Sequence, residues 1–394
     1  MSHLADRRAR LAAEMERRGA WPDRAPWIRR AAAELPRQAF APDRLWCWDG
    51  RAYTPVDRGE DPDRWAELVY PGPDDATITY VTRGVPGSSL SCEAIVADML
   101  DSLLLEPGHT VLELGSGSGR NAALAARRAG PGRVTTVEVD EGLAATAAQN
   151  LKAVGAEVAV VVGDGAAGRP GGAPYDRVIS TYAVDRVPWA WVAQTRPGGR
   201  IVTPWGRLGH VALTVAGDGR SASGWVQGLA AFMPARGTGG DRSWRRVRGD
   251  GPSEDERPFT RDVRRLAADS GNSGTSADGA DSDAAVHLGF ALRVALPEVR
   301  ITTAADEDGM NAWLHDGDSS WATLSAVGGG RTVADQGGPR RLADELERAW
   351  DRWSAAGEPD LYDFGMTVEP GRQYVWCRDP GDPWWQAEDH VPAP

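Results

Sequence analysis

A short apolar stretch that runs into a glycine-rich turn constrains the fold of this chain more than any other feature. Residues 110–114 (Thr-Val-Leu-Glu-Leu) have the composition of a buried strand, and residues 115–119 (Gly-Ser-Gly-Ser-Gly) lead from it into a helical pattern. Small residues in such a turn let the backbone approach a ligand closely, and the first amides of the following helix stay free to donate hydrogen bonds. The sequence therefore predicts a nucleotide-type pocket at this strand end.

Strands and helices alternate around this turn. A helical stripe with Ile95, Met99 and Leu103 precedes it and stops at the breaker pair Pro107-Gly108. Apolar strands that alternate with helices are typical of a parallel, doubly wound sheet. The chain is therefore predicted to have an α/β fold, with strands over 110–114, 133–139, 158–162, 177–181 and 200–203 and helices over 121–129 and 143–154.

The glycine spacing argues against a dinucleotide-binding fingerprint. A GxGxxG motif would need glycine at position 120 or 122, where Arg120 and Ala122 stand. Instead, the acid Glu113 precedes the turn. A carboxylate at a strand tip attracts a cationic ligand directly or through water, so this pocket is predicted to favour a ligand with a positive charge.

Two further acids follow the next strands along the chain. Glu138 ends one strand, where a carboxylate can accept from both hydroxyls of a ribose, and Asp164 ends the next, where it can accept from an adenine amino group. Each acid alone is equally consistent with a solvated residue at a strand end. Together with Glu113, at one edge of a sheet, they describe a site for an adenosine with a cationic amino-acid tail. S-adenosylmethionine is therefore the predicted cofactor.

The remaining sequence suggests four parts. At about 150 residues per domain, 394 residues correspond to two or three domains. Two short helices are expected in the first forty residues and a short strand near 77–81, and one C-terminal helix carries Leu342, Leu346, Ala349, Trp350 and Trp353 on one face. The predicted parts are an N-terminal helical and loop region (1–85), a cofactor-binding domain (86–248), a flexible linker or insertion (249–285) and a C-terminal α+β domain (286–394).

Composition and charge exclude several classes of protein. The formal net charge of −12 argues against a nucleic-acid partner, and no apolar run approaches the ~20 residues that span a bilayer. The N-terminus has no apolar segment typical of a secretory signal, and the three cysteines are far apart, as expected for reduced thiols. We therefore expect a cytoplasmic protein without a membrane partner. The histidines have no metal-ligand spacing, so no metal site is predicted.

Several motifs, taken in order, resemble the protein-L-isoaspartate (D-aspartate) O-methyltransferase family. They are the turn 115–119, Val-Val-Gly-Asp-Gly (161–165), Ala-Pro-Tyr-Asp-Arg (173–177), Pro188, Arg-Pro-Gly-Gly-Arg-Ile-Val (196–202) and the segment 36–42. The resemblance covers residues 5–215 and implies a Rossmann-like class I S-adenosylmethionine-dependent methyltransferase. The donor-binding residues that it implies are Glu113, Gly115, Ser116, Gly117, Gly119, Asn121, Glu138, Val139, Gly163, Asp164, Gly165 and Thr181.

The family resemblance also implies a serine segment that faces the methyl donor. The candidates are Ser88 and Ser89, whose hydroxyls would contact the accepting carboxylate, and Ser91. An N-cap role is the structural alternative and suits Ser91 best, because Glu93 follows in the first turn of the expected helix. The proline that the family carries shortly after its serine is absent here, where Cys92 and Glu93 stand.

The chain continues beyond the family's usual length and resembles longer bacterial members that act on ribosomally made, post-translationally modified peptides. That subgroup implies O-methylation of an aspartate in a precursor peptide of the lanthipeptide or graspetide kind, followed by closure to a succinimide (aspartimide). The alternatives are repair of isoaspartyl residues in damaged proteins and a binding module that keeps S-adenosylmethionine without catalysis. The expected partner is a peptide or protein that bears Asp or isoAsp. A carboxylate acceptor is ionised at neutral pH, so no general base is required.

Overall fold

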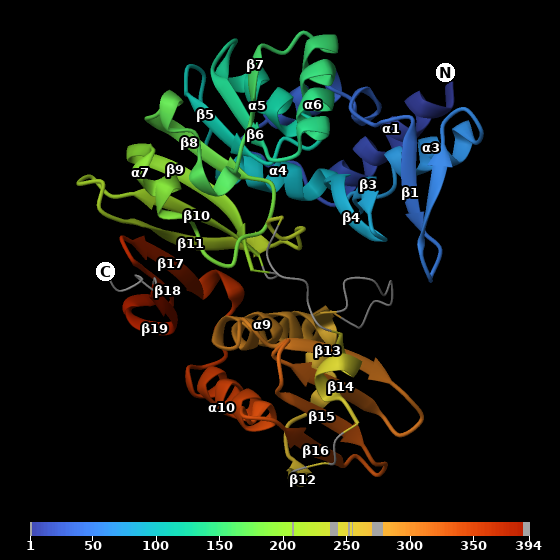
Figure 1. The fold of residues 1–394 in the computed structure, drawn as a ribbon, viewed down its shortest axis with the longest axis vertical. Coiled ribbons are helices and arrows are strands. Elements are labelled where there is room, and N and C mark those ends of the chain that lie inside the picture. Colours follow the sequence, from blue (N-terminus) through green and yellow to red (C-terminus); the bar gives the residue numbers. More distant parts are fainter. Residues whose placement is uncertain are drawn as a thin grey trace. The chain divides into compact units, whose positions relative to one another are not determined.

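The computed structural model describes residues 2–206, 209–236, 243–250, 253, 255–269 and 279–388 (Figure 1). The chain forms two compact units. Unit 1 comprises Met1–Ala235, Met366–Gln373 and Glu388–Pro394, and unit 2 comprises Arg236–Gly365 and Tyr374–Ala387. The division at 85, 248 and 285 stays a sequence-based prediction.

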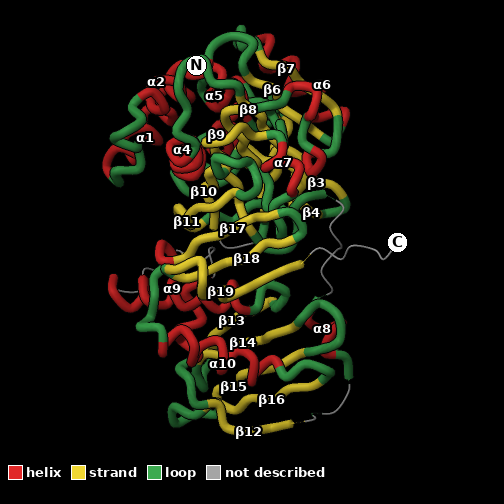
Figure 2. Tube along the Cα trace, turned by 90° about the vertical axis from the view of Figure 1, so that its left-hand side faces the viewer, coloured by secondary structure: helices red, strands yellow, loops and turns green. Residues whose placement is uncertain are grey.

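A parallel sheet lies at the centre of unit 1, as predicted. Neighbouring strands β7, β6, β5, β8 and β9 run parallel (Figure 1). β10 and β11 continue the same sheet beyond β9 (Figure 2), with β10 antiparallel to β9 and β11 antiparallel to β10. Strands β17, β18 and β19 follow β11 in the sheet order. The bounds are β5 (Val111–Leu114), β6 (Val134–Glu138), β7 (Val158–Val162), β8 (Tyr175–Ser180), β9 (Thr195–Trp205), β10 (Gly209–Val215), β11 (Ala222–Leu229), β17 (Phe364–Glu369), β18 (Arg372–Cys377) and β19 (Asp379–Glu388).

Local capping fixes where the helices of this sheet begin. The Asp140 carboxylate accepts from the Leu143 N–H at 3.0 Å and caps α6, while α5 begins after Gly119 at a φ of +85°. A Cβ at Gly119 would lie 3.2 Å from Leu151, so glycine permits α5 to approach α6 closely. The helices are α4 (Glu93–Ser102), α5 (Arg120–Ala129), α6 (Glu141–Ala153) and α7 (Trp189–Ala193).

The first ninety residues contain more regular structure than the sequence predicted. The two expected helices are α1 (Ser2–Arg17) and α2 (Trp27–Glu34), and α2 packs against both α4 and α5. In place of an irregular region, a four-stranded antiparallel sheet has the order β2-β1-β3-β4. Its elements are η1 (Arg37–Ala39), β1 (Arg44–Trp48), β2 (Tyr53–Asp57), α3 (Pro62–Val69), β3 (Thr77–Thr82) and β4 (Val85–Leu90).

Prolines explain why this sheet was missed. Pro55 lies in β2, which is an edge strand, and Pro62 occupies the first turn of α3, where Asp61 caps the helix by accepting from the Arg64 N–H. Proline is tolerated at both positions, because its missing N–H is not needed there. The prolines were interpreted as signs of loops, although they lie within regular elements.

Unit 2 contains a five-stranded antiparallel sheet of order β12-β16-β15-β14-β13. The predicted apolar face of its helix α10 (Leu342–Ala355) is buried at Leu342, Leu346, Ala349, Trp350 and Trp353. The other elements are α8 (Trp244–Arg248), β12 (Asp255–Phe259), η4 (Val263–Asp269), α9 (Gly279–Ala295), β13 (Arg300–Ala305), β14 (Met310–His315), β15 (Trp321–Ala326), β16 (Thr332–Gly337) and η5 (Leu361–Asp363).

The predicted flexible linker over 249–285 falls partly on regular structure. It contains β12, η4 and the beginning of α9, while residues 251, 252, 254 and 270–278 lie outside the described part of the chain. β12 pairs with β16 from Asp255 to Phe259, and backbone pairing of this kind is not visible in a polar local composition.

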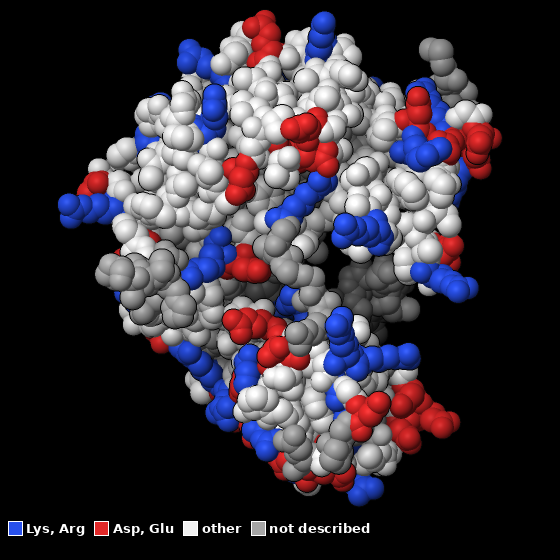
Figure 3. Space-filling model, in the orientation of Figure 1, with Lys and Arg blue, Asp and Glu red and all other residues white. Residues whose placement is uncertain are grey.

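Within the described residues no helix combines the length and the apolar character needed to cross a bilayer. Over the face drawn in Figure 3, basic and acidic side chains are interspersed.

Candidate functional site

Glu113 is fully buried on β5, between a helix and a neighbouring strand. Its carboxylate accepts from Thr136 Oγ1 on β6 at 2.5 Å and from Asn121 Nδ2 on α5 at 2.8 Å. Burial raises the pKa of Glu113 to about 7, even though both hydrogen bonds lower it, and the nearby charge of Glu138 raises it further. Each Glu113 oxygen thus accepts one hydrogen bond, and the carboxylate is held between β6 and α5.

Glu138 lies at the end of β6 and holds the glycine-rich turn. Its carboxylate accepts from the backbone N–H of Gly117 at 3.0 Å and from that of Asp140 at 3.2 Å. Each carboxylate oxygen has a second lone pair, so Glu138 keeps capacity for two further donors such as ribose hydroxyls. The structure therefore places Glu138 against the turn, as the strand pattern predicted.

Asp164 ends the next strand and is exposed. It caps the short helix η2 (Gly165–Ala167) by accepting from the Ala166 N–H at 2.9 Å. Gly165 is buried, and its carbonyl accepts from Trp191 Nε1 at 2.8 Å. Gly163 lies between the strand and this cap, and a Cβ added there would be in ordinary contact with Val137. Asp164 is thus rigidly held at the same sheet edge as Glu138, with its second oxygen open.

Two valines at this edge are exposed although they are apolar. Val139 follows Glu138 and is 50% exposed, and Val162 precedes Gly163 and is 53% exposed. Exposed apolar side chains beside two hydrogen-bonding acids suit the faces of an aromatic ring. Val139 is among the predicted donor-binding residues, and Val162, at the end of the valine-rich strand β7, is an addition from the structure.

Close packing and hydrogen bonds from neighbouring elements fix the turn 115–119. Gly115 has a φ of +94°, and a Cβ there would lie 2.6 Å from Thr181 Oγ1, which donates to the Gly115 carbonyl at 2.5 Å. Ser116 Oγ and Thr136 Oγ1 are hydrogen-bonded at 2.7 Å, so Ser116 points away toward β6. Thr181 and Ser116 therefore hold the turn and contribute little surface of their own.

The structure separates the three candidate serines. Ser88 is buried on β4, and a Cβ at Gly117 would lie 3.5 Å from its hydroxyl oxygen, so Ser88 lies beside the glycine-rich turn. Ser89 is half-buried and alternates to the other face of the strand. Of the predicted serines, Ser88 is the one that the fold brings to the turn.

The prediction that Ser91 caps the following helix is wrong. Helix α4 begins at Glu93, and the residue before it is Cys92, without a side-chain capping bond. The Ser91 carbonyl instead accepts from the Arg37 guanidinium at 2.6 Å. This contact holds the peptide unit after Ser91, and the helix starts one residue later than expected.

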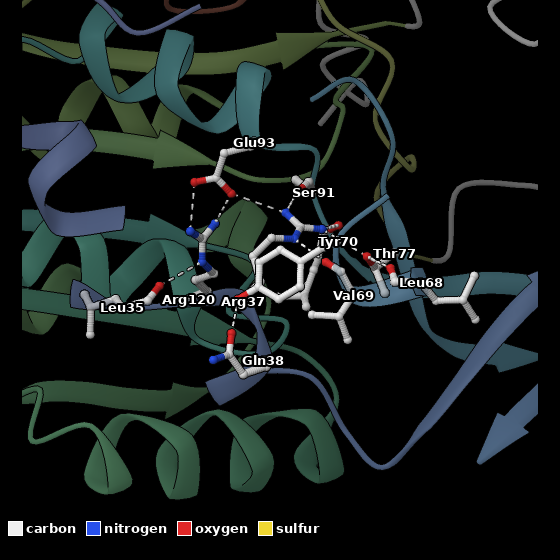
Figure 4. A network of polar contacts seen from close by, with 11 residues as sticks. Leu35, Arg37, Gln38, Leu68, Val69, Tyr70, Thr77, Ser91, Glu93 and Arg120 are labelled. Carbon is white, nitrogen blue, oxygen red and sulfur yellow. Dashed lines mark hydrogen bonds and ion pairs between the residues drawn. The ribbon is translucent and has the colours of Figure 1, made fainter. Parts of the chain in front are cut away.

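A buried ion-pair network beside this segment was missed. Arg37 and Arg120 converge on the Glu93 carboxylate (Figure 4), and all three side chains are buried. In the sequence, Arg37 lies in a family motif, Glu93 is predicted in the first turn of a helix, and Arg120 interrupts the spacing of a dinucleotide fingerprint, so none of the three indicates an ion pair. The one sequence feature that sets this position apart is that the family's proline is absent where Cys92 and Glu93 stand.

Comparisons with known proteins agree with this geometry. A family model described as Protein-L-isoaspartate(D-aspartate) O-methyltransferase (PCMT) matches residues 73–227. A protein-L-isoaspartate O-methyltransferase of Methanopyrus kandleri is 41% identical over 172 residues, which cover 41% of this chain and 75% of the relative. Another, of Hyperthermus butylicus, is 34% identical over 242 residues, covering 58% of this chain and 87% of the relative.

A solved structure of a protein-L-isoaspartate O-methyltransferase is similar over nearly the whole chain. The similarity covers 94% of this chain and 100% of the other, with a TM-score of 0.50 and 21% identity. At that identity the similarity concerns the fold alone. The solved protein-L-isoaspartate O-methyltransferase therefore has a fold that extends over a similar length of chain.

The sheet order, the glycine-rich turn and the acids at three strand ends define the class of protein, a Rossmann-like S-adenosylmethionine-dependent methyltransferase. The cofactor fits the residues present, because Glu138 accepts one hydrogen bond at each oxygen beside the turn and keeps capacity for further donors. Within that class, the chain belongs to the protein-L-isoaspartate (D-aspartate) O-methyltransferase family.

Proposed function

We propose that this protein transfers the methyl group of S-adenosylmethionine to the free carboxylate of isoaspartyl residues in peptides and proteins. The observation that carries the proposal is the match to the Methanopyrus kandleri protein-L-isoaspartate O-methyltransferase, which spans three quarters of that relative at 41% identity. The position of the Ser88 hydroxyl beside the glycine-rich turn supports it, because that turn faces the methyl donor in the proposed arrangement.

Methyl transfer to a carboxylate depends on alignment of the carboxylate with the methyl donor more than on acid–base catalysis. An isoaspartyl carboxylate is ionised at neutral pH, so one of its oxygens can take the methyl group directly while the donor's sulfur keeps the bonding electron pair. The chain has to orient the carboxylate in line with the donor and exclude water. In this proposal Ser88 donates a hydrogen bond that orients the acceptor. Ser89, through its hydroxyl, and Ser91 remain predicted contacts of the same segment.

The donor site of the proposal lies at the carboxyl ends of β5, β6 and β7. Glu138 takes the ribose hydroxyls, Asp164 takes the adenine amino group, and Val139 covers one face of the ring. The proposed donor-binding residues are Glu113, Gly115, Ser116, Gly117, Gly119, Asn121, Glu138, Val139, Gly163, Asp164, Gly165 and Thr181.

The prediction of a ribosomally made precursor peptide as substrate has less support. It rested on the length of the chain beyond the sheet, yet the solved protein-L-isoaspartate O-methyltransferase is similar over 94% of this chain. Length therefore does not separate peptide maturation from repair. We keep the precursor peptide, with aspartimide as its product, as one arm of the test.

The test compares three acceptors under the same conditions. The protein is incubated with S-adenosylmethionine labelled in its methyl group and with an isoaspartyl hexapeptide, its aspartyl twin of identical sequence, or a precursor peptide encoded beside the gene. We expect a base-labile label on the isoaspartyl peptide alone. Label on the precursor alone, followed by loss of methanol, would replace our proposal with peptide maturation, and label on none of the three would contradict both.

A further inference from the structure

Two guanidinium groups and one carboxylate form a buried cluster that links the serine segment to the glycine-rich turn. We call Arg37, Glu93 and Arg120 the arginine brace. No more than 6% of any of the three side chains is exposed. The three residues come from η1, α4 and α5, and Figure 4 shows their charged groups pointing toward one another.

Arg37 uses all of its nitrogens. Nε donates to the Val69 carbonyl at 2.8 Å, one terminal nitrogen donates to the Ser91 carbonyl at 2.6 Å, and the other donates to Thr77 Oγ1 at 3.0 Å and to the Leu90 carbonyl at 3.3 Å. Two of these acceptors are consecutive carbonyls at the end of the serine segment. Arg37 therefore holds the segment by its backbone.

Glu93 connects this contact to the cofactor side. Its carboxylate receives two hydrogen bonds from Arg120, at 2.9 and 2.8 Å, and lies 3.5 Å from Arg37. Arg120 is the first residue of α5, directly after the turn 115–119, and its Nε donates to the Leu35 carbonyl at 3.3 Å. The brace thus joins the segment before α4 to the start of α5 through charged hydrogen bonds alone.

The brace contains two positive charges and one negative charge away from water. The two arginines lower the pKa of Glu93 although burial alone would raise it, so the carboxylate is ionised. Four backbone carbonyls offset the excess positive charge. A buried arrangement of this kind contributes little net stability compared with apolar packing, so a geometric role is the better explanation for it.

Strand pairing alone leaves the serine segment poorly fixed. The register between β3 and β4 shifts on both sides of Tyr80, and β4 is an edge strand. A trans peptide directs its C=O and N–H to opposite sides, so a carbonyl bound to Arg37 also fixes the direction of the next N–H. The Arg37 contacts to Leu90 and Ser91 therefore set the orientation of two successive peptide units beside the predicted acceptor site.

We propose that Arg37 is a positioning residue for the acceptor: it fixes the serine segment 88–91 against the glycine-rich turn, with Glu93 and Arg120 as its anchor. This inference rests on the proposed function, because it assigns the acceptor to that segment. It also accounts for the missing proline, since the position after Cys92 is taken by the carboxylate that the brace requires.

The test uses Arg37→Lys, since a lysine has a single donor atom and cannot reach the same set of acceptors. We expect the affinity for S-adenosylhomocysteine, measured by calorimetry, to stay within about twofold of wild type, while kcat/KM for the isoaspartyl hexapeptide falls by about thirtyfold or more. Arg128→Lys is the matched control, because Arg128 also donates to a backbone carbonyl and to a carboxylate, Leu105 and Glu106, and it should change neither value by more than about twofold.

A milder variant tests the same role in case Arg37→Lys does not fold. Thr77→Val keeps the shape of a buried side chain but removes one acceptor of Arg37, and we expect a smaller fall in kcat/KM of about three- to tenfold with unchanged S-adenosylhomocysteine binding. Equal losses of donor affinity and acceptor kcat/KM in these variants, or wild-type kcat/KM in both, would overturn the positioning role.

A measurement without catalysis separates this inference from the proposed function. Hydrogen exchange of the amides in residues 86–92 should be faster in Arg37→Lys than in wild type, with the amides of 115–121 changed less. If no isoaspartyl peptide is methylated, the proposed function fails but this exchange result still decides whether Arg37 holds the segment. Exchange that is unchanged in 86–92 would overturn the inference whatever the activity.

Discussion

At the scale of single residues, the strand-end acids were predictable and their partners were not. Glu113, Glu138 and Asp164 each follow or end a short apolar strand, and the carboxyl ends of parallel strands gather at one sheet edge. Local sequence therefore places them together. The contacts of Glu113 with Thr136 and of Arg37 with Glu93 join positions 23 and 56 residues apart, and only the folded sheet brings them into reach.

The pKa of Glu113 predicts how stability depends on pH. A carboxyl whose pKa in the folded protein is about 7, above its unfolded value, favours the folded state at low pH and loses that advantage as the pH rises from about 4.5 to 7. Glu113→Gln does not titrate. Relative to Glu113→Gln, the wild-type protein without ligand should therefore lose about 3 kcal/mol of unfolding free energy between pH 4.5 and pH 8.

Urea unfolding of both proteins at several pH values measures this difference. The unfolding free energy of wild type minus that of Glu113→Gln should be constant above pH 8 and should rise as the pH falls below 7. A difference that stays constant over the whole range would contradict a raised pKa of Glu113.

Substitution of Gly115 tests whether cofactor binding depends on the backbone shape of the glycine-rich turn. Gly115→Ala should lose about 1–2 kcal/mol of stability from its positive φ and should also weaken S-adenosylhomocysteine binding by about tenfold, because its methyl group collides with Thr181. Gly108→Ala is the control, since Gly108 has a φ of +86° with nothing within 4 Å. It should lose similar stability and bind like wild type, and equal binding losses in both would remove the specific role of the turn.

At the scale of elements, the regular α/β part was predictable and the first ninety residues were not. Strands β5 to β9 are short apolar runs separated by helices, which is a strong local pattern. The β1 to β4 sheet contains Pro55, Pro86 and several polar residues, and its stability comes from pairing between strands that local composition does not reveal. The same holds for β12, which was expected to be linker.

The start of α4 gives an element-scale prediction. Glu93→Gln would leave Arg37 and Arg120 buried without a counter-charge and should cost about 3–5 kcal/mol of unfolding free energy, measured by urea titration at neutral pH. Glu67→Gln, which removes the partner of Arg7 and Arg64 in a half-exposed pair, should cost less than about 1 kcal/mol. Similar costs for both would mean that water reaches the brace.

At the scale of the whole molecule, the site residues lie in one unit. The strand ends, the turn and the serine segment all belong to unit 1, while α10 belongs to unit 2. The chain has seventeen tryptophans, and a high tryptophan content can serve either core packing or an aromatic binding surface. Trp350, Trp353 and Trp321 are buried within unit 2. These three support the interpretation as core.

Substitution of Trp353 tests whether binding at the donor site in unit 1 is independent of the stability of unit 2. Its side chain is 1% exposed and its indole N–H donates to the Pro359 carbonyl at 2.9 Å, so Trp353→Ala should cost unit 2 about 3–5 kcal/mol. Thermal unfolding should show a lowered transition, while S-adenosylhomocysteine affinity at low temperature stays within about twofold. A matching loss of affinity would mean that the donor site depends on unit 2.

Binding of the demethylated product probes the arrangement most directly, because it needs no acceptor. Titration calorimetry with S-adenosylhomocysteine should give one site per chain in the wild-type protein, with affinity reduced by about tenfold or more in both Glu138→Ala and Asp164→Ala, and unchanged in Asp185→Ala outside the proposed site. Wild-type protein that gives no heat of binding, or both site variants binding as tightly as wild type, would contradict the account.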